Sequence, residues 1–239
     1  LYRLNPAVET AKPLRLLAFT TAGDFMANTP VEFLLEGSSV RLDILYVAPG
    51  QALPAFIPEH DVAFIAIAES EENQALLEEM REIAATWPVP IINAADRIAR
   101  LTRDGAYQLL RDAPGLVMPP NLRLRRAQLQ EIAGHGRTLD TIMPHCTFPI
   151  IARPVGSHGG EGLQRLVGPG ELKTYLEARK EAEFYVAPFA DYRSEDRLYR
   201  KYRVVLINGR AYGCHLAISP HWMVHYLNAD MHDNPANRA

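Results

Sequence analysis

The sequence predicts an α/β protein in which a mostly parallel sheet is followed by a part built from β-hairpins. Between residues 14 and 93, apolar runs of strand length alternate with helical segments, which is the pattern of a parallel sheet covered by helices. Between residues 148 and 167, two apolar strands enclose a loop with four glycines. Further on, two β-rich runs flank Asn208-Gly209, a pair typical of tight hairpin turns.

Composition narrows the class of protein. With 239 residues, 48% of them hydrophobic and 22% charged, the chain can bury one large core or two modest ones. The formal net charge of −3 does not favour nucleic-acid binding. The one tight basic cluster, Arg123, Arg125 and Arg126, is too small to argue otherwise. We therefore expect no nucleic-acid partner.

The two cysteines, Cys146 and Cys214, have neither a C-x-x-C spacing nor a disulfide-rich context, so a reduced cytoplasmic setting is expected. The sequence contains no apolar run of membrane-spanning length, so no membrane association is expected. The chain starts with Leu1 instead of Met, and we expect it to begin partway into a longer protein.

The strands of the parallel sheet are expected at 14–20, 40–47, 61–68 and 89–93, where apolar and β-branched residues dominate. An amphipathic helix is predicted over 71–86.

A helix after the first strand is expected to have Thr29 as its N-cap and Pro30 as its first residue. Loops at the carboxyl ends of parallel strands build binding sites, which singles out Asp24 and Asn28 after the first strand and Asn93 after the fourth. For Asp24 and Asn28 the alternative is turn or cap chemistry, and the residues alone leave both open.

From Asn93 a helical stretch runs to Arg111, with Arg103 in its second part, and residues 114–120 are an extended connector. Further helices are expected over 127–134 and 171–182, with a strand over 183–190.

The central feature is a strand, a glycine loop and a second strand. Residues 148–152 deliver one cation, Arg153, into a loop whose glycines can turn backbone N–H groups toward an anion. Because the loop is followed by a strand and not by a helix, it fits neither a dinucleotide-binding loop nor a Walker loop. It is either a flap that closes over phosphates or a long flexible hairpin tip. The candidate phosphate-binding residues are Arg153, Gly156, Ser157, His158, Gly159, Gly160 and Gly162.

The segment Arg153 to Gly162 resembles the glycine-rich flap of the ATP-grasp superfamily, which includes glutathione synthetase, D-alanine–D-alanine ligase and the ribosomal-protein glutamate ligases. Together with two further matching stretches, the resemblance covers residues 93–228. That family usually has a lysine where this chain has Arg153, which keeps the charge and changes its shape.

The resemblance implies an N-terminal Rossmann-like pre-ATP-grasp α/β domain (1–115), then an incomplete ATP-grasp α+β fold. The latter would comprise a lobe with the flap (116–188) and the start of a second lobe (189–239).

By the same resemblance, ATP would contact Arg103 and the flap, while Ala187 or Phe189 would meet the adenine and Asp191 the ribose. Lys201 and Arg203 on the C-terminal hairpin would act in catalysis. The open alternatives are a solvated helix-start arginine for Arg103, a surface turn for Asp191, and exposed strand charges for the hairpin pair. The candidates for the second substrate are Asp24, Asn28, Asn93, His225 and Asn228.

The implied function is an ATP-dependent carboxylate–amine ligase that works through an acyl phosphate, with ATP and a small-molecule or peptide carboxylate or amine as its expected partners. The family holds Mg²⁺ with an aspartate and a Glu-x-Asn strand near its end, and this chain lacks that strand, so we expect the metal ligands beyond residue 239 and none before it. A histidine site at 215, 221 and 225 is disfavoured because no carboxylate joins these residues.

The alternative functions are a non-catalytic nucleotide-binding or regulatory module of a larger protein and, in another class, a sugar- or dinucleotide-binding protein. Homodimer formation and fusion to other domains both stay open.

Overall fold

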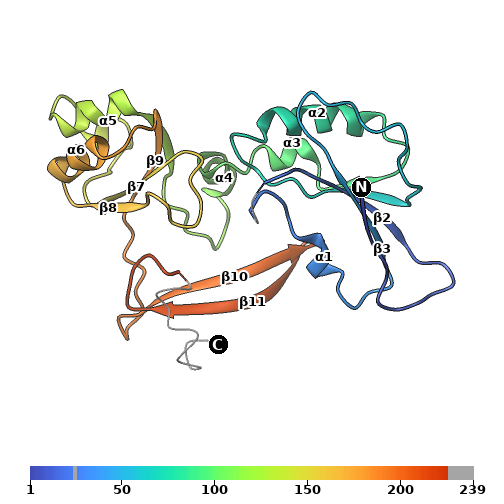
Figure 1. Cartoon of the computed structure of the whole chain (residues 1–239). Coiled ribbons are helices and arrows are strands. Elements are labelled where there is room, and N and C mark those ends of the chain that lie inside the picture. The colour runs from blue at the N-terminus through green and yellow to red at the C-terminus, as the bar shows by residue number, and fades with distance from the viewer. Residues whose placement is uncertain (24–25, 226–239) are drawn as a thin grey trace. The chain divides into compact units, whose positions relative to one another are not determined.

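The computed structural model describes residues 1–23 and 26–225, and the chain divides into two compact units, Leu1–Arg123 and Leu124–Ala239. Figure 1 shows the course of the chain through both. No helix in the described ranges is both long and apolar enough to cross a bilayer.

The first unit contains a five-stranded sheet in the order β1-β3-β2-β4-β5. The strands β2, β3, β4 and β5 are parallel to their neighbours, whereas β1 runs antiparallel to β3. The predicted parallel sheet is therefore confirmed. The strand bounds are β1 Tyr2–Leu4, β2 Arg15–Thr20, β3 Arg41–Tyr46, β4 Val62–Ile65 and β5 Ile91–Ile92.

Helices cover both faces of this sheet because its side chains alternate between two apolar cores. Leu17 and Phe19 of β2 pack with α2 (Gln74–Ala85) and α3 (Ala95–Ile98). Their neighbours Leu16 and Ala18 face the other way and pack with Val31 of α1 (Val31–Leu34). In Figure 1, α2 and α3 accordingly lie across the sheet from α1.

The predicted cap of α1 is wrong. Pro30, with φ −76° and ψ 74°, occupies the N-cap, and the helix has no side-chain cap hydrogen bond. Thr29 instead donates its backbone N–H to the carbonyl of Ala66 at 2.6 Å, which ties the loop to the segment after β4. The helical stretch from Asn93 is interrupted between α3 and α4 (Arg103–Leu110), where Thr102 caps α4 by accepting a bond from Gly105.

The second unit is built on a four-stranded sheet in the order β6-β9-β7-β8, in which β7 is antiparallel to both neighbours. The predicted strand, glycine loop and strand are thus confirmed as the β7–β8 hairpin. The bounds are β6 Leu122–Arg125, β7 Ile150–Pro154, β8 Gln164–Leu166 and β9 Glu183–Pro188, with helices α5 Arg126–Ala133, η1 Leu139–Thr141 and α6 Pro169–Glu177.

The two faces of this sheet differ in chemistry. Phe184 of β9 contacts Tyr175 of α6 edge to face, so its side of the sheet faces the helices. Residues that alternate with it point to the opposite side, where Arg153 pairs with Tyr185 across β7 and β9. One face is thus an apolar core and the other carries a cation.

A separate two-stranded sheet contains the last two strands of the described residues. β10 (Tyr199–Ile207) and β11 (Arg210–Ser219) are antiparallel, and the turn residues Asn208 and Gly209 have φ values of 49° and 74°. Positive φ at both positions is what a type I′ turn requires, and the predicted hairpin is confirmed.

Candidate functional site

The candidate site is the sheet face of β7, β8 and β9 that points away from the helices, together with the glycine loop at residues 155–163. The four glycines of the loop all have positive φ: Gly156 80°, Gly159 58°, Gly160 87° and Gly162 64°. Residues with a Cβ rarely adopt these φ values. Glycine is therefore needed at these four positions for the backbone conformation of the loop.

Arg153 delivers a buried positive charge to the start of the loop. Only 8% of the Arg153 surface is exposed to solvent. The guanidinium donates from Nε to Ser157 Oγ at 3.0 Å and from Nη2 to the Ser157 carbonyl oxygen. Ser157 Oγ donates in turn to the Pro154 carbonyl at 2.8 Å. The planar fork therefore brackets the loop, a geometry that a lysine ammonium cannot reproduce.

A second cation, Arg165, lies on the same sheet face, because it pairs with Ile151 across β7 and β8. Its guanidinium lies 4.3 Å from the ring centroid of Phe189, at cation–π distance. Phe189 also meets Trp222 edge to face at 5.7 Å. The sequence patterns did not single out Arg165. The alternation of side chains along β8 is the signal that could have found it. Arg165 lies opposite Ile151, and this position is on the same face as Arg153.

The segment after β11 approaches the glycine loop. A Cβ placed on Gly160 would lie 3.3 Å from Met223 Sδ. Together with Trp222 against Phe189, this contact places residues 222–223 beside the loop and the end of β9. His225 follows closely and is half-buried.

The exit from β9 carries the residues expected to meet a nucleoside. Ala187 is 4% exposed and lies opposite Ile151. The backbone N–H of Phe189 donates to the Pro149 carbonyl at 3.0 Å, so this donor already has a partner within the unit. Asp191 forms an ion pair with Arg193, which lowers the pKa of the carboxyl below its ordinary value.

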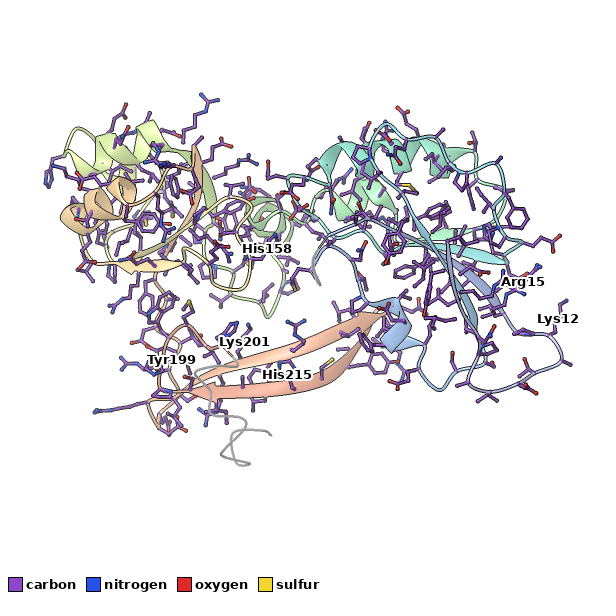
Figure 2. The ribbon with its side chains drawn as sticks, viewed as in Figure 1. Lys12, Arg15, His158, Tyr199, Lys201 and His215 are labelled. Carbon is purple, nitrogen blue, oxygen red and sulfur yellow. The ribbon has the colours of Figure 1, made fainter. Side chains whose placement is uncertain are left out.

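Lys201 and Arg203 lie two residues apart on β10 and are both exposed. The pairing register sets Lys201 opposite Ala217 and Arg203 opposite His215, so these side chains share one face of the hairpin. Figure 2 shows Lys201 on β10 and His215 on β11, with His158 in the glycine loop. Two cations and an imidazole are thereby grouped on one hairpin face.

The loop after β2 is held by its own polar groups. Asn28 Oδ1 accepts from the Thr21 backbone N–H, and Asn28 Nδ2 donates to the Thr21 carbonyl, both at 2.8 Å. This is the turn chemistry that the sequence left as an alternative. Asn93 is exposed with φ 60° and turns the chain from β5 toward α3. Asp24 and Asn228 lie outside the described residues.

Arg103 is the first residue of α4, directly after the capping Thr102. It belongs to the first unit, whereas Arg153, Lys201 and Arg203 belong to the second.

The helix side of the second unit holds a different group of cations. A cavity of about 550 Å³ opens between α5 and α6, lined in part by Arg126 and Arg179. The Arg126 guanidinium donates to the carbonyls of Leu176, Arg179 and Glu181 at 2.8–3.0 Å. Its charge thus serves the end of α6, and we assign this cavity no part in the candidate site.

Within residues 1–23 and 26–225, no three His, Cys, Asp or Glu side chains gather in a way that could hold a metal ion. The cationic face described above has the chemistry to bind an anion such as a polyphosphate: a buried guanidinium, a second one on the next strand and a loop that contains four glycines.

No protein-family model and no curated protein sequence matches the chain. Solved structures do resemble it. D-alanyl-alanine synthetase A from Vibrio cholerae has a TM-score of 0.53 at 11% identity, with 96% of this chain and 74% of that chain covered. VanG D-Ala:D-Ser ligase from Enterococcus faecalis has a TM-score of 0.51 at 12% identity, covering 86% and 69%.

Carboxyaminoimidazole ribonucleotide synthase from Aspergillus clavatus, solved with ATP, has a TM-score of 0.52 at 15% identity. The matched region covers 86% of this chain and 54% of that enzyme. At such identities the likeness shows the fold alone.

Proposed function

We propose that this chain, which has the fold of the ATP-grasp superfamily, binds ATP on the face of β7, β8 and β9 that carries Arg153. The observation that supports this most is the buried Arg153 guanidinium, bonded to Ser157 at the start of a four-glycine loop. Arg165 adds a second charge on the same face. Cations and N–H donors bind polyphosphates in proteins, and this face offers two guanidinium groups beside a glycine loop.

We propose further that the activity is ATP-dependent ligation of a carboxylate to an amine. The similar structures include a D-Ala:D-Ser ligase and a carboxyaminoimidazole ribonucleotide synthase solved with ATP. In such a reaction a carboxylate oxygen attacks the γ-phosphorus and ADP leaves. The amine then attacks the acyl carbon, and inorganic phosphate leaves.

In this scheme the protein positions the groups and neutralises charge. Arg153 would hold the phosphates, with Arg103 as a further candidate. Lys201 and Arg203 would face the transferred phosphoryl group, and residues 156–162 would keep water from the acyl phosphate. Ala187, Phe189 and Asp191 would meet the nucleoside, although the Phe189 N–H and the Asp191 carboxylate must then exchange their present partners.

Mg²⁺ would enter as the ATP complex, and we place no metal ligand among the described residues. The carboxylate and amine substrates would meet Asp24, Asn28, Asn93, His225 and Asn228, and Asn28 would have to give up its present bonds to Thr21.

A nucleotide panel in a thermal-unfolding assay tests the binding proposal. ATP with Mg²⁺ should raise the melting temperature and NAD should not, because the loop lacks the dinucleotide fingerprint. A shift with NAD and none with ATP or ADP would overturn it.

A product assay then decides whether the chain is a ligase. Release of ADP and phosphate that depends on both a carboxylate and an amine would support ligation. ATP binding without any turnover would support the nucleotide-binding or regulatory module instead.

A further inference from the structure

One end of the glycine loop is tied to a helix. Tyr175 of α6 is 3% exposed, and its hydroxyl donates to the Gly162 carbonyl at 2.9 Å. Gly162 is the last glycine before β8. A partly buried hydrogen bond therefore joins the helix layer to the point where the loop re-enters the sheet.

The Tyr175 ring is itself held on two sides. Phe184 of β9 contacts it edge to face at 5.7 Å, and the Arg179 guanidinium lies over it at 4.6 Å from the ring centroid. Burial raises the pKa of the phenol to about 12, so the hydroxyl stays protonated and remains a donor at neutral pH. The donor is fixed in both position and charge state.

Gly162 is packed more tightly than Gly156 and Gly159. A Cβ on Gly162 would lie 2.6 Å from Pro154 Cδ and 2.8 Å from Arg179 Nη1. A Cβ on Gly156 or Gly159 would meet no atom within 4 Å. The β8 end of the loop is thus packed, whereas Gly156 and Gly159 border open space.

We infer that Tyr175 is a positioning residue of the glycine loop: its hydroxyl fixes Gly162, so that residues 156–160 can close over a nucleotide while the entry to β8 stays in place. This inference deepens the proposed function and rests on it for the nucleotide. Tyr175 reaches the loop only through the Gly162 carbonyl, and it touches no reacting group.

Fixing one end of a loop lowers the conformational entropy that closure must remove. Loss of the hydroxyl should therefore weaken ATP binding, by about three- to tenfold if one net hydrogen bond is lost. Once the loop has closed, the same groups face the phosphates, so kcat should change less than KM for ATP.

The variant Tyr175→Phe removes the hydrogen bond and keeps the ring. Hydrogen exchange of the nucleotide-free protein should show faster exchange for the amides of residues 160–163 and unchanged protection in β7 and β9. Tyr46→Phe is the matched control, because Tyr46 is 59% exposed and lies in the other unit. Equal exchange of residues 160–163 in wild type and Tyr175→Phe would overturn the inference.

ATP titration of both proteins provides the second readout. The expected result is a three- to tenfold higher dissociation constant for Tyr175→Phe and no change for Tyr46→Phe. An unchanged constant for Tyr175→Phe would overturn the role in loop closure. A wild-type chain that binds no ATP would overturn the proposed function, and the exchange result alone would then decide whether Tyr175 fixes Gly162.

Discussion

The β7–β8 and β10–β11 hairpins of the second unit both carry cationic side chains, but these side chains differ in how firmly their surroundings hold them. β7 lies between β8 and β9, and its Arg153 is 8% exposed and bonded to Ser157. Within the described residues β10 pairs only with β11, and its Tyr202 and Leu206 are 67% and 74% exposed. One hairpin is part of a core and the other is largely solvated.

The base of β10–β11 is its best-packed part. Tyr199, Ala217 and Val224 form a small buried cluster there, with Trp222 against it. A two-stranded sheet gains little stability by itself, whereas a strand with neighbours on both sides and helices on one face is fixed by many contacts. The comparison indicates that the position of Arg153 is fixed by its surroundings in the structure without a ligand. The positions of Lys201 and Arg203 depend on the pairing of β10 with β11.

The largest expected difference concerns core packing. Phe184 of β9 is 0% exposed and packs on the side of the sheet that faces the helices. Its replacement by alanine (Phe184→Ala) should lower the free energy of unfolding by about 3–5 kcal/mol. Leu206→Ala on β10 should change it by less than about 0.5 kcal/mol. Urea unfolding of both variants measures this. Similar losses for the two would contradict the contrast between the hairpins.

A second expected difference lies within the glycine loop. Gly162→Ala should lower the free energy of unfolding by about 2–4 kcal/mol, because the new Cβ would combine a positive φ with contacts to Pro154 and Arg179 that are too close. Gly159→Ala should lower the free energy of unfolding by only about 1 kcal/mol, because the positive φ is unfavourable and the new Cβ meets no other atom within 4 Å. Melting temperatures of the two variants give the comparison. A Gly159 variant at least as unstable as the Gly162 variant would show that the loop end is not the packed one.

Acid should weaken the β10 region through Asp196. Arg200 of β10 donates to this carboxylate, and the pair lowers the pKa of Asp196 from 3.8 to about 2. A lowered folded-state pKa gives stability that is present above the unfolded value near 3.8 and is lost as the pH falls toward 2. Arg153 of β7 donates to the hydroxyl and carbonyl oxygens of Ser157, neither of which titrates in this pH range. Hydrogen exchange at pH 5 and pH 3 should therefore show β10 losing protection before β7.

The control for this effect is Asp196→Asn, in which the acid sensitivity of β10 should be smaller. If β10 protection in wild type and variant falls equally between pH 5 and pH 3, another group is responsible.

Much of the fold was predictable because local patterns encode it. The apolar runs of β2, β3 and β4, the helical spacing of α2 and the Asn208-Gly209 turn each carry their signal within a few residues. The boundary at Thr29 was wrong because Pro30, which fits a first helical turn, adopts a non-helical ψ at the cap.

Two strands were not predicted, for different reasons. β1 has three residues and is defined by its antiparallel pairing with β3 forty residues away, which no local pattern records. It is further held by Arg3, which donates to the buried Asp43 carboxylate at 2.6 Å. β6 has the alternating sequence Leu-Arg-Leu-Arg, and its arginines drew attention as a basic cluster instead of as a strand.

The candidate site was predictable only in part. Arg153 and the loop glycines stand out in the sequence because of their spacing. Arg165 and Tyr175 do not, since each acquires its role from a partner across the sheet or on another layer. The same holds for Asn28, whose two bonds to Thr21 could not be told from ligand contacts before the loop was seen.

The most direct test of the account is the ATP dissociation constant of Arg153→Ala and Arg153→Lys, measured beside their unfolding midpoints. If Arg153 is the preformed phosphate-binding cation, Arg153→Ala should weaken ATP binding about ten- to a hundredfold in a folded protein. Arg153→Lys should keep part of the affinity, because the charge remains and the fork that holds Ser157 is lost. A dissociation constant for Arg153→Ala equal to that of wild type would contradict the central claim and leave Arg153 with a purely structural role in the loop.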